Sequence, residues 1–378
     1  MSTKNQLSKI KSSDFIIKKT DQEEDIDEKI PFTYSITSYG ADYTIDSLVK
    51  RIENGSIVVP IFQRGYVWKI REASRFIESL LLGLPIPGIF LAKEEDTNKL
   101  LVIDGLQRLR TLQYFYEGCF QPEKQEFALQ NVQEQFEGIT YQSLSWEQRR
   151  DLDDSIVHAT IVKQDQYSDD NSSIYHIYER LNTGGTQLTS QEIRSCIYHG
   201  PFNELLKELN GNKSWRAIYG DDDLSKIRMR DEELILRFLA LYFSPLTQQQ
   251  KLSYKKPMKE FLNLYMGKNK RLQFNSEIEI RQAFEPTIEL VYKTLGKKAF
   301  KPKKTFNSTV FDAVMIGIAR RLSQGNISDL ERERLPEKYE ELLRDREFRQ
   351  STVDTARTTE EDVVNSRIKI ATQIFADL

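Results

Sequence analysis

The sequence predicts an α+β protein in which a mixed N-terminal part precedes an all-helical part. Up to about residue 200, short apolar runs of strand length alternate with amphipathic stretches of helical period. From Phe202 onward only helical patterns occur, and the strongly apolar stretch 231–243 predicts a core helix. The chain has 378 residues, enough for two domains. We expect a tail over residues 1–30, a first domain over 31–200 and a helical domain over 201–378.

The composition favours a globular protein of a reducing compartment. Residues 1–30 are polar with an acidic run, so we expect a solvated tail there. The formal net charge of −3 is not that of a generic nucleic-acid coat, so DNA binding would need a local patch. Cys119 and Cys196 indicate free thiols. The sequence has no signal-like region and no apolar run of about eighteen residues, so we expect a cytoplasmic protein without a membrane partner.

The periodicity of apolar residues places the elements of the first domain. A capping box at Ser145 opens one helix, and Asn54-Gly55 ends another. The stretch between the strands at 89–92 and 100–103 predicts a hairpin turn. Helices are expected at 44–52, 72–82, 145–154 and 171–181, and strands at 56–60, 89–92, 100–103 and 158–163.

The central feature is the stretch Asp104-Gly-Leu-Gln-Arg108, where a strand passes through a glycine turn into a helix. Free backbone N–H groups and the positive end of a helix dipole meet at such a turn, which favours a bound phosphate. Gln107 and Arg108 lie in the first helical turn, where an amide and a guanidinium can reach the same anion. Asp104 can hold a metal-bound water, orient an attacking water or cap the helix, and these roles stay open.

A second polar cluster follows the predicted strand at 56–60 and contains Gln63, Arg64, Tyr66 and Trp68. An arginine beside an amide is typical of an anion clamp, because the planar guanidinium matches phosphate geometry. The two aromatic side chains can instead belong to the core.

A glycine-containing loop follows the predicted helix at 171–181. Two glycines permit positive φ angles and close backbone approach, so the loop can cover a nucleotide or a DNA phosphate, or it can simply end the helix. Arg194 lies on the next helix, which a capping box at Thr189 opens, and it can turn toward the same site. The loop begins with Asn182, Thr183, Gly184 and Gly185.

Three motifs in this order resemble the N-terminal domain of GmrSD-type restriction endonucleases, a family with a DGQQR motif. They are Val59-Pro-Ile-Phe-Gln-Arg-Gly-Tyr-Val-Trp68, Asp104-Gly-Leu-Gln-Arg-Leu109 and Tyr178-Glu-Arg-Leu-Asn-Thr-Gly-Gly-Thr-Gln-Leu188. The resemblance covers residues 40–265 and implies a ParB/sulfiredoxin-like fold for the first domain. The chain departs from the family at Leu106, where the family usually has glutamine, and this bears on hydrolysis more than on binding.

The resemblance implies a phage-defence protein that binds a nucleoside triphosphate (GTP, ATP or CTP) with Mg²⁺ and senses DNA. An NTPase reaction would use Asp104, Gln107 and Arg108, with Asp104 holding the metal. A partner nuclease would act in trans, and a homo-oligomer is compatible with this reading. The expected nucleotide contacts are Gln63, Arg64, Tyr66, Trp68, Gly105, Asn182, Thr183, Gly184, Gly185 and Arg194.

Charge is concentrated in residues 251–304, which contain 14 Lys/Arg and 5 Asp/Glu, a balance of +9. Such a segment is either a solvated face or a surface that follows a nucleic-acid backbone, and binding of the second kind weakens steeply with salt.

Several chemistries find no support in the sequence. Only three histidines occur, without a His-Asn-His pattern, and neither a Cys-x-x-Cys pair nor a Walker motif is present. A nuclease activity of the chain itself is therefore disfavoured. The alternative to a nucleotide-binding sensor is a non-enzymatic DNA-binding or adaptor module that uses the same phosphate clamp on the DNA backbone.

Overall fold

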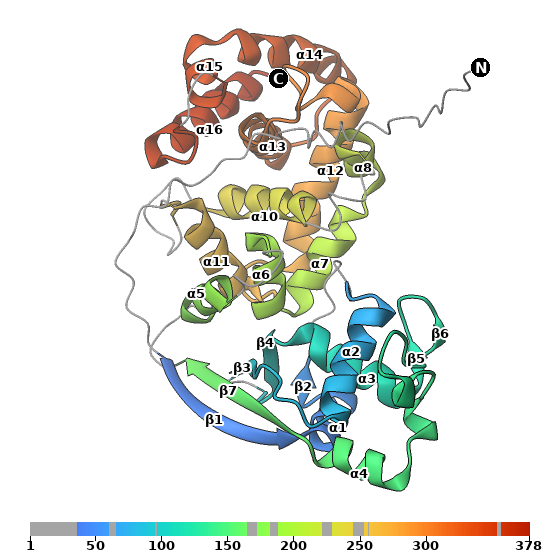
Figure 1. The fold of residues 1–378 in the computed structure, drawn as a ribbon. Helices are drawn as coiled ribbons and strands as arrows, with labels where there is room; N and C mark the ends of the chain where they lie inside the picture. The colour runs from blue at the N-terminus through green and yellow to red at the C-terminus, as the bar shows by residue number, and fades with distance from the viewer. Residues whose placement is uncertain are drawn as a thin grey trace, which may run out of the picture.

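The computed structural model describes residues 36–59, 66–94, 97–164, 172–181, 188–220, 229–244, 253–255, 257–353 and 357–378. It confirms the predicted α+β class, because a mixed sheet forms in the N-terminal part and helices follow it (Figure 1). No helix in these ranges is long and apolar enough to cross a bilayer.

The sheet has five strands in the order β1-β7-β3-β4-β2. The β1·β7 and β3·β4 pairs are antiparallel, whereas β3·β7 and β2·β4 are parallel. This order places β4 inside the sheet, with Phe90 of β3 opposite Asp104. The strands are β1 (Ile36–Thr44), β2 (Ile57–Val58), β3 (Ile89–Lys93), β4 (Leu100–Asp104) and β7 (Ile156–Gln164).

Helices of the N-terminal part cover one face of this sheet. Two of them begin at a side-chain cap, which is Thr44 before α1 and Ser145 before α4. A small hairpin of β5 (Cys119–Phe120) and β6 (Gln125–Glu126) lies beside them (Figure 1). The helices are α1 (Ile45–Glu53), α2 (Ile70–Leu81), α3 (Leu106–Glu117) and α4 (Trp146–Asp154).

The remaining helices form the C-terminal part of the chain. Helices α5 and α6, which lie within the predicted first domain, contribute to the same core cluster as the later helices. They are α5 (Ser172–Leu181), α6 (Ser190–Ile197), α7 (Pro201–Asn210), α8 (Lys213–Tyr219), α10 (Arg230–Phe243), α11 (Met258–Asn269), α12 (Glu277–Leu295), the 3₁₀ turn η3 (Gly296–Lys298), α13 (Ser308–Ser323), α14 (Asp329–Arg344), α15 (Arg346–Thr352) and α16 (Glu361–Ala376).

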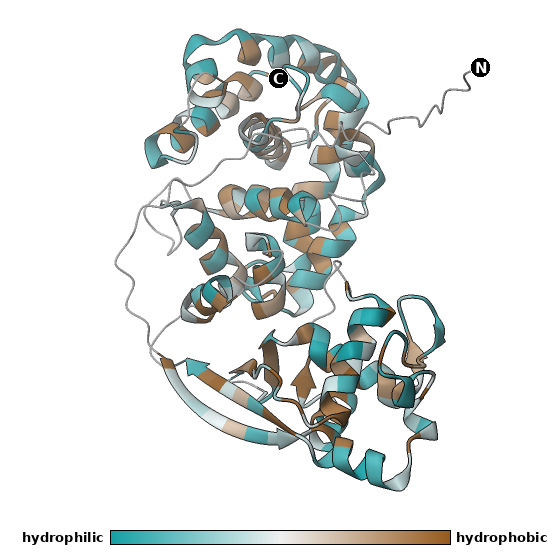
Figure 2. Ribbon diagram, viewed as in Figure 1, coloured by the Kyte–Doolittle hydropathy of each residue, from teal (hydrophilic) through white to brown (hydrophobic). Residues whose placement is uncertain are grey.

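The sheet separates two hydrophobic cores, and β4 contributes to both. Leu100 and Val102 pack with α1, α2 and α3, whereas Leu101 and Ile103 belong to the cluster of the helical part. A strand that is buried on both faces needs a continuous apolar run, which explains the sequence of β4. Figure 2 shows the central strands as hydrophobic where they lie between the two layers of helices.

Most predicted elements are confirmed, with differences at the strands. The expected strand at 56–60 is reduced to β2, and residue 60 lies outside the described residues. The nine-residue strand β1 was not predicted. Among the described residues it pairs with β7 alone, and most of its side chains are exposed, so its sequence lacks a clear apolar alternation.

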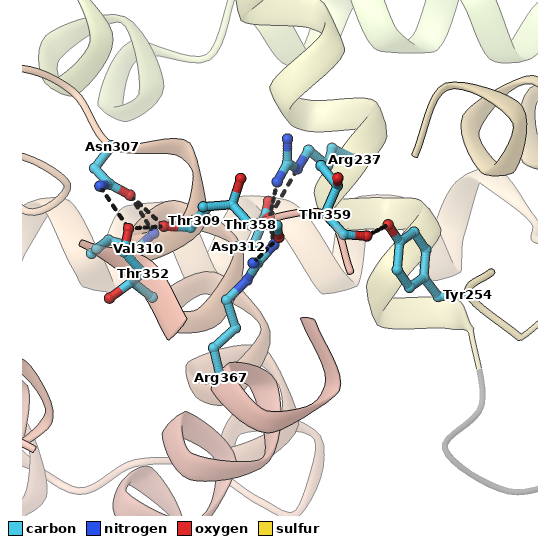
Figure 3. Close-up of polar contacts among 10 residues, drawn as sticks. All are labelled: Arg237, Tyr254, Asn307, Thr309, Val310, Asp312, Thr352, Thr358, Thr359 and Arg367. Atoms are coloured by element: carbon cyan, nitrogen blue, oxygen red, sulfur yellow. Dashed lines mark hydrogen bonds and ion pairs between the residues drawn. The ribbon is translucent and has the colours of Figure 1, made fainter. Parts of the chain in front are cut away.

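A buried polar network joins three helices of the C-terminal part (Figure 3). Asp312 on α13 accepts hydrogen bonds from Arg237 of α10 at 2.8 Å and from Arg367 of α16 at 3.1 Å. Asp312 and Arg367 are fully buried, and Arg367 also donates to the carbonyl of Thr358. The carboxylate therefore compensates buried positive charge from two other helices.

We expect Asp312→Asn to lower the free energy of unfolding by about 3–5 kcal/mol, because removing one partner leaves buried guanidinium groups without their counter-charge. Denaturant unfolding measures the change. Glu289→Gln is the matched control, since it neutralises the exposed pair with Lys293 and should cost about 1 kcal/mol or less. Equal costs for the two variants would contradict this role of Asp312.

Candidate functional site

The candidate site is the turn between β4 and α3. Gly105 has φ 99°, and a Cβ atom there would lie 2.5 Å from Cγ2 of Ile89, so only glycine fits. Helix α3 then begins at Leu106 without a side-chain cap and without an acidic residue in its first turn. Its first N–H groups therefore have no side-chain acceptor from the cap residue, as an anion site requires.

Arg108 fixes the carboxylate of Asp104. Its Nη2 donates to Oδ2 of Asp104 at 2.8 Å, and its Nη1 donates to the carbonyls of Pro87 and Gly88. The Asp104 side chain is 47% exposed, whereas that of Arg108 is 14% exposed. Arg108 thus ties the end of β4 to the connector before β3, while the carboxylate stays accessible.

Gln107 joins the second predicted motif to the turn. Its Oε1 accepts hydrogen bonds from the backbone N–H groups of Val67 at 3.0 Å and Trp68 at 3.3 Å. Because both partners are donors, the amide orientation is settled, and its NH₂ group is left to donate elsewhere. The hydroxyl of Tyr66 bonds to that of Thr111 at 2.6 Å on the next turn of α3.

The structure therefore brings the described end of the first motif against the second motif. On the other flank of the first motif, Arg110 donates to the carbonyl of Val59 at 2.9 Å. The predicted clamp residues Gln63 and Arg64 lie outside the described residues.

Tyr66 and Trp68 pack in an aromatic cluster beside α3. The ring of Tyr66 packs edge-on against those of Tyr114 and Phe120, with centroid distances of 5.2 and 5.6 Å. The rings of Trp68 and Phe76 have centroids 5.8 Å apart. Burial raises the pKa of the Tyr66 hydroxyl well above its usual value, so this group remains protonated. Both rings are half-buried, and their predicted contact with a nucleotide stays a prediction.

Arg194 lies in the helical core. Its guanidinium donates to Asn263 at 2.8 Å, to Gln191 at 3.0 Å and to Glu233 at 2.8 Å, and the side chain is 1% exposed. These partners stand on α6, α10 and α11, so the structure does not bring Arg194 to the β4–α3 turn. Asn182, Thr183, Gly184 and Gly185 lie outside the described residues.

Two features of the site were missed in the sequence. Tyr178 of α5 donates a hydrogen bond of 2.5 Å to the carbonyl of Val102, two residues before Asp104, and so fixes β4 from the helical side. The connector Pro87-Gly88 supplies the acceptors for Arg108, and a Cβ atom at Gly88 would lie 2.8 Å from the carbonyl oxygen of His158. The prolines flanking Ile86 were the available signal, because they indicate a rigid segment.

Residues 45–199 match the family model described as GmrSD restriction endonuclease, N-terminal domain. This segment is a GmrSD N-terminal domain. The resemblance inferred from the three motifs is thereby confirmed, and it relates the chain to restriction-type defence. The match runs from α1 to the end of α6, so α7 to α16 lie outside it. Among curated proteins and solved structures, none matches the chain.

We expect Gly105→Ala to destabilise the protein more than Gly55→Ala, its matched control. Both glycines have positive φ, which costs alanine about 1–2 kcal/mol, but a Cβ atom at Gly55 meets nothing within 4 Å. The overlap with Ile89 should add about 1–3 kcal/mol at Gly105. Denaturant unfolding of both variants measures the difference, and equal losses would refute the steric argument.

Proposed function

We propose that the β4–α3 turn binds the phosphates of a nucleoside triphosphate with Mg²⁺, and that this binding controls a restriction-type response to DNA. The observation that carries the proposal is the meeting of three groups at one glycine turn: an accessible carboxylate, an uncapped helix start and an amide NH₂ group. Backbone N–H groups at a helix start suit phosphate oxygens, and the amide adds a further donor.

Each side chain would then have a defined task. The NH₂ group of Gln107 donates to a phosphate oxygen, because its carbonyl oxygen is occupied by Val67 and Trp68. Arg108 acts chiefly as a positioning residue, since its guanidinium already has three protein acceptors. Arg64 and the loop that begins at Asn182 keep their predicted roles as phosphate clamp and cover.

The residues present also fit a magnesium ion that arrives with its nucleotide. Mg²⁺ at nucleotide sites is commonly held by one or two carboxylates together with substrate phosphates and water. Asp104 offers one oxygen for this purpose, because the other is held by Arg108. In the ranges that the structure describes, no group of three or more His, Cys, Asp or Glu side chains could hold a metal by itself. The ion would supply charge neutralisation to the phosphates.

The proposal for the whole system extends to DNA and to a nuclease acting in trans. Nucleotide binding, with or without hydrolysis, would control contact with DNA or with that partner.

The second candidate function is a non-enzymatic DNA-binding module. Leu106 favours it, because this departure from the family's usual glutamine bears on hydrolysis more than on phosphate binding.

We expect isothermal titration with GTP, ATP or CTP to detect Mg²⁺-dependent binding, and phosphate release on the same samples to report hydrolysis. Asp104→Asn should weaken binding in Mg²⁺ by about tenfold, or about 1.4 kcal/mol, and should remove the difference between Mg²⁺ and EDTA. Asp151→Asn, which changes an exposed aspartate of α4, is the control and should bind normally. If none of the nucleotides binds the native protein, the non-enzymatic module takes over.

The role of Arg108 can be separated from a direct clamp by a double-mutant cycle. If Arg108 acts through Asp104, Arg108→Ala should weaken nucleotide binding in the native background but add little in the Asp104→Asn background. A direct phosphate contact predicts that the two losses add. Arg150→Ala on α4 removes an exposed arginine and serves as the control in the same titrations.

A further inference from the structure

Several basic side chains of residues 251–304 have partners within the protein. Arg281 bonds to three glutamates, and Lys301 donates to the carbonyl of Ile218 at 3.1 Å. The carboxylates of Glu179, Glu94 and Glu289 pair with Lys259, Lys270 and Lys293 respectively. The excess positive charge of the described part of this segment therefore lies on the basic side chains that lack such partners.

Four of the lysines without such partners are close together in the chain. Lys297, Lys298, Lys303 and Lys304 are exposed, and no carboxylate in the described ranges forms an ion pair with any of them. They lie within eight residues of each other, in the connection between α12 and α13. We call this group the lysine patch.

The backbone that carries the lysine patch is anchored from several sides. The hydroxyl of Tyr339 on α14 donates to the carbonyl of Ala299, and the N–H of Asn307 donates to the carbonyl of Phe300 at 2.8 Å. The buried ring of Phe300 contacts that of Phe311 at 4.9 Å. Helix α8 also packs against η3. The four charges are thus presented from a fixed backbone, which lowers the entropy cost of binding.

Helix capping does not account for the patch. Lysines after the C-terminus of a helix interact favourably with its dipole, and this explanation applies to Lys297 and Lys298 after α12. Lys303 and Lys304, however, precede the N-terminus of α13, where positive charge gains nothing from the dipole. Four neighbouring like charges without counter-charges repel each other unless an anionic partner binds.

We propose that the lysine patch is a contact surface for the phosphate backbone of duplex DNA. Lysine suits this partner as a mobile point charge that contacts phosphates without reading sequence. The surface lies outside the matched family segment, so the helical part would supply non-specific DNA contact to the N-terminal site. The inference rests on the proposed contact with DNA and does not depend on nucleotide binding.

The test compares DNA affinity across salt concentrations for the full chain and for a variant with Lys→Gln at positions 297, 298, 303 and 304. Each lost phosphate contact should lower the slope of log K against log salt by about 1, so the variant should lose about 3–4 in slope. At low salt its affinity should fall by roughly tenfold or more. The matched control carries the same change at Lys50, Lys99, Lys255 and Lys369, which are exposed outside the patch, and should keep the native slope.

Every outcome decides the matter. A loss confined to the patch variant, with an unchanged melting temperature, supports the proposal. Equal slopes for the patch variant and the native chain overturn the patch while leaving DNA binding itself intact. A native chain that binds no duplex overturns both the patch and the proposed contact with DNA. Nucleotide titration then tests separately whether the β4–α3 turn binds a nucleotide. Capture of polyglutamate in place of duplex would assign the surface to an acidic protein.

Discussion

The packing of β4 between two cores is the constraint on which the site depends. Alternate side chains of this strand enter opposite clusters, so a shift of one residue would exchange both sets at once. The hydroxyl of Tyr178 adds a directional contact to the carbonyl of Val102. Asp104 ends this strand. Its position is therefore fixed by packing in two hydrophobic cores.

The polar side chains of the turn already make hydrogen bonds within the protein, and this limits which of their groups can bind a ligand. Arg108 holds the Pro87-Gly88 connector, and Gln107 holds the segment at Val67 and Trp68. What remains for a ligand is one oxygen of Asp104, the NH₂ group of Gln107 and the N–H groups at the start of α3. These groups are preorganised by the same bonds, which is how a site gains affinity without additional contacts.

Local rules predicted the helices and their caps well, because those signals lie within a few residues. The capping boxes at Ser145 and Thr189 are examples. The sequence assigned the two motifs to one phosphate site, but it did not predict their contact at Gln107, which is made by backbone N–H groups. The strand β1 was missed, since its stability comes from pairing with residues more than a hundred positions away. Arg194 was expected at the turn, but the spacing of a helix does not tell which neighbour its buried face meets, and here that neighbour is Glu233.

The sequence alone also does not tell which charged side chains form ion pairs, and this bears on the lysine patch. A sequence allows basic residues to be counted, but only folding decides which of them find carboxylates. Arg281 and Lys259 are satisfied by glutamates on their own or on other helices. Lys297 and Lys304 have no such partner among the described residues, although both lie in the same basic segment. An unpaired group of this kind adds no ion-pair stabilisation to the fold, so its placement on an anchored backbone is best understood through a partner outside the chain.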